Sequence, residues 1–206
     1  MAAEARIARR LGWRVAIGGG TAAGAEVAAD QLIGSGARAL VSFGLAGGLD
    51  PALRPGTIIV PSAVILDDMA YPTDPELTHR LGGATPHVSV AADQLAASAA
   101  AKCRLYRATA AAAVDLETGP VARAARAKGL PFAVLRAICD PADRCLPPAA
   151  VVALDAYGAI AAWRVLRSLA RRPNQLPALF DLAADAAAGR RALIRRMKEL
   201  VQAGVP

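Results

Sequence analysis

Two acidic residues of this chain stand at the ends of apolar runs, where catalytic carboxylates are commonly found. Glu117 ends the run that begins at Ala113, and Asp140 ends the run that begins at Leu135. Each run is predicted to be a strand, and an alanine-rich helix that stops near Gly129 separates them. Cleavage of a bond between a sugar and a base needs one carboxylate for the sugar hydroxyls and one to protonate the departing base. The pair predicts this chemistry.

Both acids also have a purely structural interpretation. Glu117 would lie in the first turn of a helix, where the helix dipole favours a negative charge. Asp140 precedes Pro141 and is a candidate turn or cap residue, although Asp143 is the better candidate for the cap. We prefer the functional interpretation of Glu117 and keep both for Asp140.

A glycine-rich turn near the start of the chain indicates a site for a phosphate or a ribose. Gly18-Gly19-Gly20-Thr21 follows a predicted strand over 13–17 and matches the dinucleotide-binding pattern G-x-G-x-x-A. That pattern needs an acid at the end of the next strand, but the strand predicted over 38–43 ends in Gly44–Gly48, and the first acid is Asp50. We therefore disfavour a nicotinamide cofactor. The turn keeps backbone N–H groups that could face a phosphate or ribose, or it is simply a close turn.

The remaining elements alternate in a way that predicts an α/β fold. A second glycine run, Ser42–Gly48, would let a flat base or sugar lie close to the backbone, or it is a structural turn. Strands that alternate with helices predict a three-layer α/β/α fold with its site at the carboxyl ends of the strands. The other predicted elements are a helix capped by Thr21 and running to about 33, two short strands in 57–66 around Pro61, a loop over 69–85, a strand at 87–90, a helix over 93–107, strands at 111–115 and 132–138, and helices from Pro148 onward with breaks at Pro173 and near Gly189.

Composition limits the class of protein. A length of 206 residues fits a single domain over 1–206, with a helical C-terminal part from 148. Alanine inflates the hydrophobic fraction of 55%, and no stretch reaches the roughly 18 uncharged apolar residues of a membrane helix. The best candidate, Ala149–Trp163, contains Asp155. The basic N-terminus lacks the apolar region of a signal peptide, so we expect a cytoplasmic protein.

Cysteines, histidines and charges narrow the partners further. Three cysteines and two histidines show no metal-ligand spacing and no CxxC pair, so no metal is expected and the thiols are expected to be reduced. The net charge of +7 is concentrated after Arg164, which suits an anionic lipid surface or merely solvent-facing helices. Basic residues are not interleaved with stacking aromatics, so no nucleic acid is expected.

Taken in order, the motifs resemble one superfamily. Gly18–Gly20, the run Ser42–Gly56, Val114–Glu117 and Arg136–Asp140 together are similar to the purine nucleoside phosphorylases and the methylthioadenosine/adenosylhomocysteine nucleosidases, over roughly residues 1–147. Within this superfamily the chain most resembles the hopanoid-associated phosphorylases. The cues are Met1–Ile7, the short segment Lys102–Thr109 and the tail Leu166–Leu179. The resemblance implies a nucleoside-phosphorylase-like fold with a central mixed sheet, and removal of adenine from adenosylhopane in hopanoid biosynthesis.

The resemblance also implies roles for single residues. Glu117 would bind the 2′- and 3′-hydroxyls of the ribose, with Leu116 beneath the sugar. Asp140 would protonate N7 of the purine, for which burial must raise its pKa. Glu4 would activate the attacking water, although the sequence alone marks it as a surface residue. Gly44 and Ser42 would contact the substrate.

Two departures from the superfamily pattern concern the start of the sheet and the nucleophile. A strand normally precedes the segment that matches Met1–Glu4, and here it is missing. Bacterial phosphorylases place an arginine and a serine on phosphate where this chain has Ser42 and Leu45, which weakens the case for phosphorolysis. Water activated by Glu4, and phosphate held by a loop of Gly18, Gly20 and Thr21, both remain open.

The sequence therefore predicts an enzyme that cleaves the N-glycosidic bond of an adenosine-type nucleoside without metal or organic cofactor, with phosphate as an optional co-substrate. Adenosylhopane is the expected substrate, and methylthioadenosine or adenosylhomocysteine is the alternative. A non-catalytic nucleoside-binding or scaffold protein is the alternative of another class. The resemblance implies a homodimer, and a lipid-linked substrate would bring the basic C-terminal helices to the inner membrane.

Overall fold

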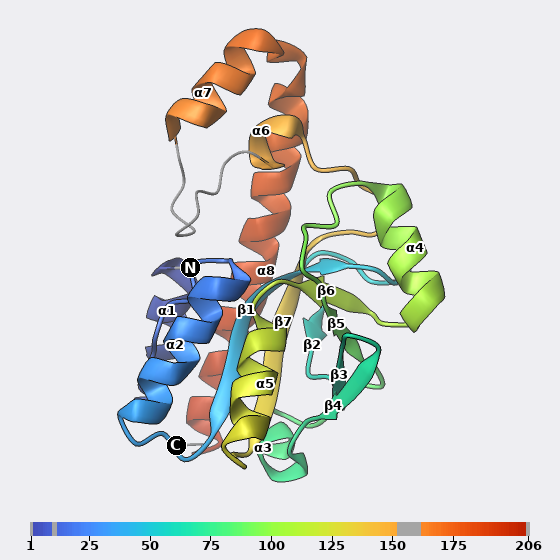
Figure 1. Ribbon diagram of the computed structural model, residues 1–206. Helices are drawn as coiled ribbons and strands as arrows, with labels where there is room; N and C mark the ends of the chain where they lie inside the picture. The colour runs from blue at the N-terminus through green and yellow to red at the C-terminus, as the bar shows by residue number, and fades with distance from the viewer. Residues whose placement is uncertain (1, 10–11, 152–161, 205–206) are drawn as a thin grey trace.

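The computed structural model describes residues 2–9, 12–151 and 162–204, and its centre is a mixed sheet (Figure 1). The strands are β1 (Leu40–Gly48), β2 (Ile58–Ile59), β3 (Ala63–Leu66), β4 (Met69–Pro72), β5 (Ser89–Ala91), β6 (Ala113–Asp115) and β7 (Phe132–Asp140). They form one seven-stranded sheet in the order β2-β7-β1-β6-β5-β3-β4. The predicted α/β class with a central mixed sheet is confirmed.

The two longest strands, β1 and β7, form the middle of the sheet. They run parallel, with Leu40 opposite Phe132, and β2 pairs antiparallel with β7 on its other side. Strand β6 meets β1 only at Gly47 and Gly48, antiparallel, before the sheet continues through β5 and β3. Among the described residues, the rest of β1 therefore pairs with β7 alone.

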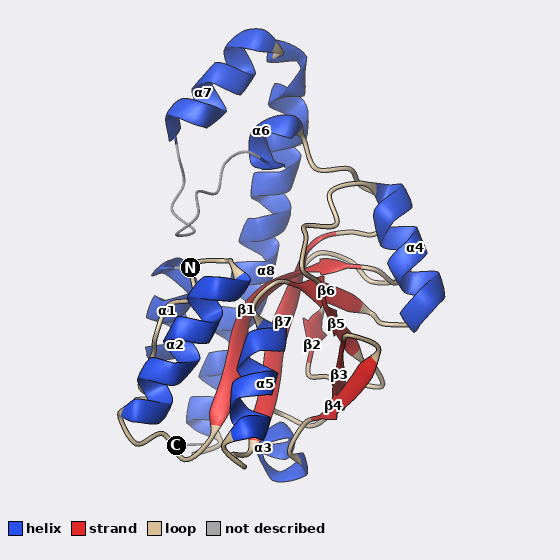
Figure 2. Ribbon diagram, in the orientation of Figure 1, coloured by secondary structure: helices blue, strands red, loops and turns tan. Residues whose placement is uncertain are grey.

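Helices cover both faces of this sheet (Figures 1 and 2). Their bounds are α1 (Ala2–Ala8), α2 (Ala22–Gly34), α3 (Pro75–Arg80), α4 (Ala99–Thr109), α5 (Thr118–Ala127), α6 (Pro148–Val151), α7 (Ala162–Arg171), the 3-10 helix η2 (Pro173–Gln175) and α8 (Leu176–Gln202). Because alternate side chains of a strand point to opposite faces, the apolar side chains of β7 contribute to a hydrophobic core on each face of the sheet. Leu135 and Ala137 pack with α1 and α8, whereas Phe132 and Val134 pack with α2 and α5.

The predicted strand over 13–17 is wrong. These residues have no regular secondary structure, although the helix that follows begins at Ala22 and is capped by Thr21 as predicted. A strand exists only when a neighbour shares its ladder of hydrogen bonds, and none of the described residues pairs with this run. An apolar run alone is therefore not sufficient to predict a strand.

The predicted loop over 69–85 is also wrong in part. Met69–Pro72 forms β4, which pairs antiparallel with β3, and Pro75–Arg80 forms α3. The side chain of Asp74 accepts a 2.8 Å hydrogen bond from the N–H of Leu77, and Pro75 occupies the first turn. An acidic cap followed by proline is a known helix start.

Where the structure describes the chain after Pro148, it is mainly helical with a break at Pro173, as predicted, but Gly189 does not break α8. This helix is continuous from Leu176 to Gln202, and Gly189 is buried inside it. A Cβ at this position would lie 2.8 Å from Cδ2 of Leu45 and 3.1 Å from the carbonyl of Ile138. The glycine therefore lets α8 pack closely on the sheet, a role that overrides its weak helix propensity.

Helices α6, α7 and η2 and the start of α8 form an arm that extends beyond the sheet (Figure 1). The Gln175 side chain ties the arm together by accepting from the N–H of Ala149 at 2.9 Å and donating to the carbonyl of Ser168 at 2.9 Å. No helix among the described residues is long and apolar enough to cross a membrane. Much of the candidate span Ala149–Trp163, including residues 152–161, lies outside the described residues.

Candidate active site

Glu117 lies at the junction between β6 and α5. The helix start is capped by Asp115 instead, whose Oδ1 accepts the backbone N–H groups of Glu117 at 2.8 Å and Thr118 at 2.7 Å. Glu117 itself makes no side-chain capping bond. Its carboxylate is therefore not needed to cap the helix and is available for other contacts.

The glycine-rich turn contacts this carboxylate directly. The N–H of Gly20 donates a 2.8 Å hydrogen bond to Oε1 of Glu117. A Cβ on Gly18 would stand 2.7 Å from the same oxygen, so a larger residue would push the carboxylate away. Two motifs that are 97 residues apart in the sequence thus meet at one carboxylate.

Arg136, from the middle of β7, holds the surroundings of Glu117 in place. Its guanidinium is 1% exposed and donates to Oδ1 of Asp115 at 2.9 Å, to Ser42 at 2.7 Å and to Thr118 at 2.9 Å. Its Nη1 lies 3.6 Å from Oε2 of Glu117, a looser contact. Most of the positive charge is therefore committed to Asp115 and the two hydroxyls.

The role of Arg136 was not predicted, although the sequence carries a signal for it. A charged residue inside an otherwise apolar, buried strand is rare unless it is paired. Gly44 on the neighbouring strand makes room for it, because a Cβ there would lie 2.6 Å from Nη1 of Arg136. The glycine run of β1 thus serves the arginine as well as any ligand.

A second site forms around Asp140 at the end of β7. Oδ2 of Asp140 lies 2.6 Å from Nζ of Lys102, which comes from α4, and the two side chains are 8% and 0% exposed. The same ammonium donates to the carbonyls of Pro141 at 2.8 Å and Arg144 at 2.9 Å. Oδ1 of Asp140 is buried and has no hydrogen-bond partner among the described residues. Lys102 was not predicted to be a site residue.

Burial and Lys102 act on Asp140 in opposite directions. Burial raises the pKa of the Asp140 carboxyl from its ordinary value of 3.8, and the hydrogen bond and charge of Lys102 offset part of this rise. The adjacent thiol responds more strongly, since burial, followed by the charge of Asp140, raises the pKa of Cys139 to about 12. A carboxylic acid with a raised pKa is suited to donate a proton to a leaving group.

A cavity of about 530 Å³ lies beside Glu117. Glu117, Arg136, Ser42 and Gly18 contribute polar or backbone groups to its wall, and Asp140 is not among its lining residues. Most of the wall is apolar and comes from α2, the segment 13–18 and the first half of β1. The Glu117 carboxylate therefore opens onto a cavity, whereas Asp140 is buried and does not line it.

Glu4 is not the surface residue that the sequence alone suggests. It lies in α1, is 4% exposed and lines the same cavity as Glu117. Its charge also contributes, after burial and the charges of Asp140 and Lys102, to the altered pKa of Cys139. Glu4 is therefore within electrostatic reach of the end of β7 and adjoins the space that a ligand could fill.

The other predicted site residues make contacts within the protein. Ser42 shares a 3.0 Å hydrogen bond with Thr118, Leu116 is half-buried, and Oγ1 of Thr21 accepts the N–H of Gly24 at 3.1 Å as the cap of α2. Their roles toward a substrate, and those of Gly18, Gly20 and Gly44, stay predictions.

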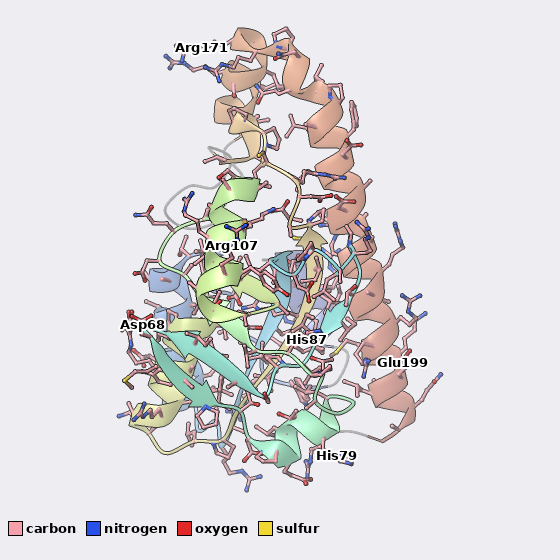
Figure 3. All side chains as sticks on the ribbon, turned by 90° about the vertical axis from the view of Figure 1, so that its right-hand side faces the viewer. Asp68, His79, His87, Arg107, Arg171 and Glu199 are labelled. Atoms are coloured by element: carbon pink, nitrogen blue, oxygen red, sulfur yellow. The ribbon has the colours of Figure 1, made fainter. Side chains whose placement is uncertain are left out.

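The described residues contain no group of three or more histidine, cysteine or acidic side chains that could hold a metal ion. His79 in α3 and His87 before β5 lie on different elements (Figure 3). The three cysteines are free.

Comparison with known proteins agrees with this architecture. A family model described as the phosphorylase superfamily matches residues 15–169. Among curated proteins, none matches the chain in sequence. The futalosine hydrolase of Helicobacter pylori superposes with a TM-score of 0.63 at 17% identity, over 88% of this chain and 76% of that chain. A 5′-methylthioadenosine/S-adenosylhomocysteine nucleosidase from the same organism superposes with a TM-score of 0.58 at 18% identity, over 87% and 76% of the two chains.

A third solved structure is similar. The putative 5′-methylthioadenosine/S-adenosylhomocysteine nucleosidase of Francisella philomiragia has a TM-score of 0.61 at 21% identity, over 88% of this chain and 77% of that chain. At these identities the likeness concerns the fold, while the family match covers most of the chain.

Proposed function

Because the chain belongs to the phosphorylase superfamily, we propose that it cleaves the N-glycosidic bond of an adenosine-type nucleoside and releases adenine. It is an enzyme of the nucleoside phosphorylase and nucleosidase type. One observation carries the proposal: Glu117, fixed by the N–H of Gly20, lies in the wall of a cavity of about 530 Å³. Cavities of this size are typical of small-molecule sites.

Glu117 binds the sugar in this proposal. Its two oxygens have four acceptor positions, of which Gly20 takes one at 2.8 Å and Arg136 approaches another at 3.6 Å. The remaining positions can accept hydrogen bonds from the 2′- and 3′-hydroxyls of a ribose. As the glycosidic bond lengthens, positive charge develops on the sugar, and a fixed carboxylate nearby stabilises it.

Asp140 serves the base. A proton passes from its carboxyl to N7 of the purine while the electron pair of the bond between C1′ and N9 moves onto the base. Adenine then departs as a neutral molecule. The raised pKa of Asp140, caused by burial, favours the protonated form from which this step begins.

Water is the nucleophile that the contacts favour. The N–H of Gly20 donates to Glu117, and the hydroxyl of Thr21 donates to the carbonyl of Gly18 at 3.5 Å, so two donors of the turn are already committed. Phosphate would need such donors. Glu4 adjoins the cavity and would take a proton from the attacking water as its oxygen bonds to C1′.

The substrate we propose is adenosylhopane, on the strength of the resemblance to the hopanoid-associated phosphorylases. The arm supports a lipid-linked substrate. Leu166 and Phe180 are 66% and 72% exposed, and Arg167 and Arg171 lie on the same arm, with Arg171 at its far end in Figure 3. Apolar side chains beside arginines are suited to the surface of an anionic membrane. We propose peripheral contact at the cytoplasmic face of the inner membrane.

The alternative substrates are methylthioadenosine and S-adenosylhomocysteine, which the fold likeness to nucleosidases favours. The test measures adenine release from each of the three nucleosides, with and without inorganic phosphate. We expect release without phosphate, with the free sugar as the second product. A sugar 1-phosphate would replace our hydrolytic mechanism with phosphorolysis. Release from none of them by correctly folded protein would contradict the proposed function and favour a non-catalytic nucleoside-binding protein.

A dimer stays a prediction of the resemblance. Light scattering of the purified protein measures the mass of the particle directly and decides between a monomer and a dimer.

A further inference from the structure

Lys102 is buried at the contact between α4 and the end of β7. Its side chain is 0% exposed, which is rare for lysine, because removing an unpaired ammonium from water is costly. All three of its N–H donors have an acceptor: Oδ2 of Asp140 and the carbonyls of Pro141 and Arg144. Three acceptors in place of water are what a buried, charged lysine requires.

The arrangement leaves the two oxygens of Asp140 in different conditions. Oδ2 is held by Lys102 at 2.6 Å. Oδ1 is buried and has no partner among the described residues. Buried polar atoms are rarely left without a hydrogen bond, and an exception calls for an explanation, of which a catalytic role is one. The free oxygen is therefore the one that would meet the base.

We propose that Lys102 is the positioning residue of the leaving-group step, which orients Oδ1 of Asp140 toward the base and stabilises the carboxylate left by proton transfer. This inference rests on the proposed function, since it assigns Asp140 as the proton donor. Before the step, Asp140 carries the proton on Oδ1, and Oδ2 accepts from Lys102. The proton then moves to a ring nitrogen of the base, and the electron pair of the glycosidic bond follows onto the base. Asp140 becomes a carboxylate beside an ammonium that has kept its own protons.

A purely structural role for Lys102 makes a different prediction. The two carbonyl contacts could simply fix the segment 141–144, and loss of Lys102 would then lower stability or activity equally at every pH. Loss of a charge beside the acid changes the acid itself. The charged or titratable groups near this end of β7 are Lys102 on α4, Arg144 in the following loop, Asp185 and Arg190 on α8, Cys139 on β7 and Glu4 on α1.

The experiment compares wild type with Lys102→Met and Lys102→Arg. Since activity requires protonated Asp140, kcat for adenine release falls as pH rises through the pKa of that carboxyl. Without the ammonium this pKa rises, so Lys102→Met is expected to move the basic limb of the pH profile upward by about 1–3 pH units. The weaker acid is expected to lower the limiting kcat, reached on the acidic side of this limb where Asp140 is fully protonated, by roughly tenfold or more. Lys102→Arg keeps the charge and is expected to keep the limb close to that of wild type.

A second readout needs no turnover. In protein labelled with 13C at aspartate carboxyls, the signal that Asp140→Asn removes reports the titration of Asp140, and Lys102→Met is expected to move that titration to higher pH. The matched controls Lys128→Met and Lys198→Met remove exposed lysines and are expected to change neither readout. If Lys102→Met does not fold, Lys102→Gln provides the same comparison, because its amide keeps two N–H donors without the charge.

The outcomes separate the two proposals. An unmoved pH limb together with an unmoved carboxyl titration in a folded Lys102→Met protein would overturn the role of Lys102 while leaving nucleoside cleavage intact. Absence of adenine release by wild type would contradict the proposed function, and the carboxyl titration would still decide whether Lys102 sets the acidity of Asp140.

Discussion

The two carboxylates of the site are both accompanied by a buried cation, but the cations are used in opposite ways. Arg136 divides its donors among Asp115, Ser42 and Thr118 and stays 3.6 Å from Glu117. Lys102 binds Asp140 at 2.6 Å and spends its other donors on backbone carbonyls. In the first region Arg136 forms, with Asp115, Ser42 and Thr118, a buried network that we call the frame. The Glu117 carboxylate stays open to the cavity.

In the second region the cation, Lys102, binds the acid itself. Oδ2 of Asp140 is bound by Lys102, Oδ1 has no hydrogen-bond partner within the part of the chain that the structure describes, and burial raises the pKa of the carboxyl. The difference suits the separate tasks proposed for them, namely accepting hydrogen bonds from a sugar and giving a proton to a base. A carboxylate beside a buried cation occurs in both regions, but the distance between the charges and the exposure of the carboxylate differ.

The largest expected effect comes from removing the acid. Asp140→Asn keeps the shape of the side chain but cannot supply the proton, so kcat for adenine release should fall by about 10²–10⁴-fold. Steady-state kinetics measure this, and thermal unfolding checks that the variant is folded. Unchanged turnover would show that Asp140 is not the proton donor, and the proposed difference in task between Glu117 and Asp140 would then be wrong.

Breaking the frame should cost stability before anything else. Arg136→Met leaves Asp115 buried without its cation and removes donors from Ser42 and Thr118, so the free energy of unfolding should fall by about 3–5 kcal/mol. Urea denaturation measures the change. A loss below about 1 kcal/mol would mean that the network is not the structural frame described above.

A milder change addresses the sugar side alone. Glu117→Gln keeps one oxygen for hydrogen bonding but loses the negative charge, so kcat/KM should fall by roughly 10- to 100-fold, with stability nearly unchanged, since Asp115 caps α5. Kinetics and thermal unfolding of the same preparation test both parts. A large loss of stability would show that Glu117 has a structural role like that of Arg136.

The smallest effect is a dependence of stability on pH. A raised pKa in the folded protein means that Asp140 holds its proton more tightly when folded, so its contribution is present below the unfolded value of 3.8 and is lost as pH rises through the folded pKa. Relative to Asp140→Asn, wild type should lose about 1.4 kcal/mol for each pH unit by which the pKa is raised. Urea denaturation of both proteins at several pH values measures the gap. A constant gap would mean that Lys102 fully offsets burial.

The sequence was sufficient for the alternation of strands and helices and for the positions of both carboxylates. Glu117 and Asp140 each end an apolar run, and that pattern is local. The cations were not local features: Asp115 lies 21 residues from Arg136, and Asp140 lies 38 residues from Lys102. Arg136 at least interrupts a buried strand, but Lys102 follows alanines in a helix that also carries Arg104 and Arg107, and nothing in the sequence distinguishes it from them.

The errors over 13–17 and at Gly189 have a common cause. A strand needs a partner, and a glycine inside a helix is tolerated where another backbone approaches closely, so tertiary contacts decided both. The helix at Pro75 could have been predicted, because Asp74 precedes it as a cap.

The continuous α8 has two halves of different character, and this should appear in amide hydrogen exchange. Its buried residues are Gly189, Ala192, Leu193, Met197 and Leu200, all in the half that packs on the sheet, and none lies in the half that carries the arm. Amides exchange through local opening, which is easiest where few apolar contacts hold the backbone. One uninterrupted helix should therefore contain a gradient of protection, with fast exchange before Gly189 and slow exchange after it.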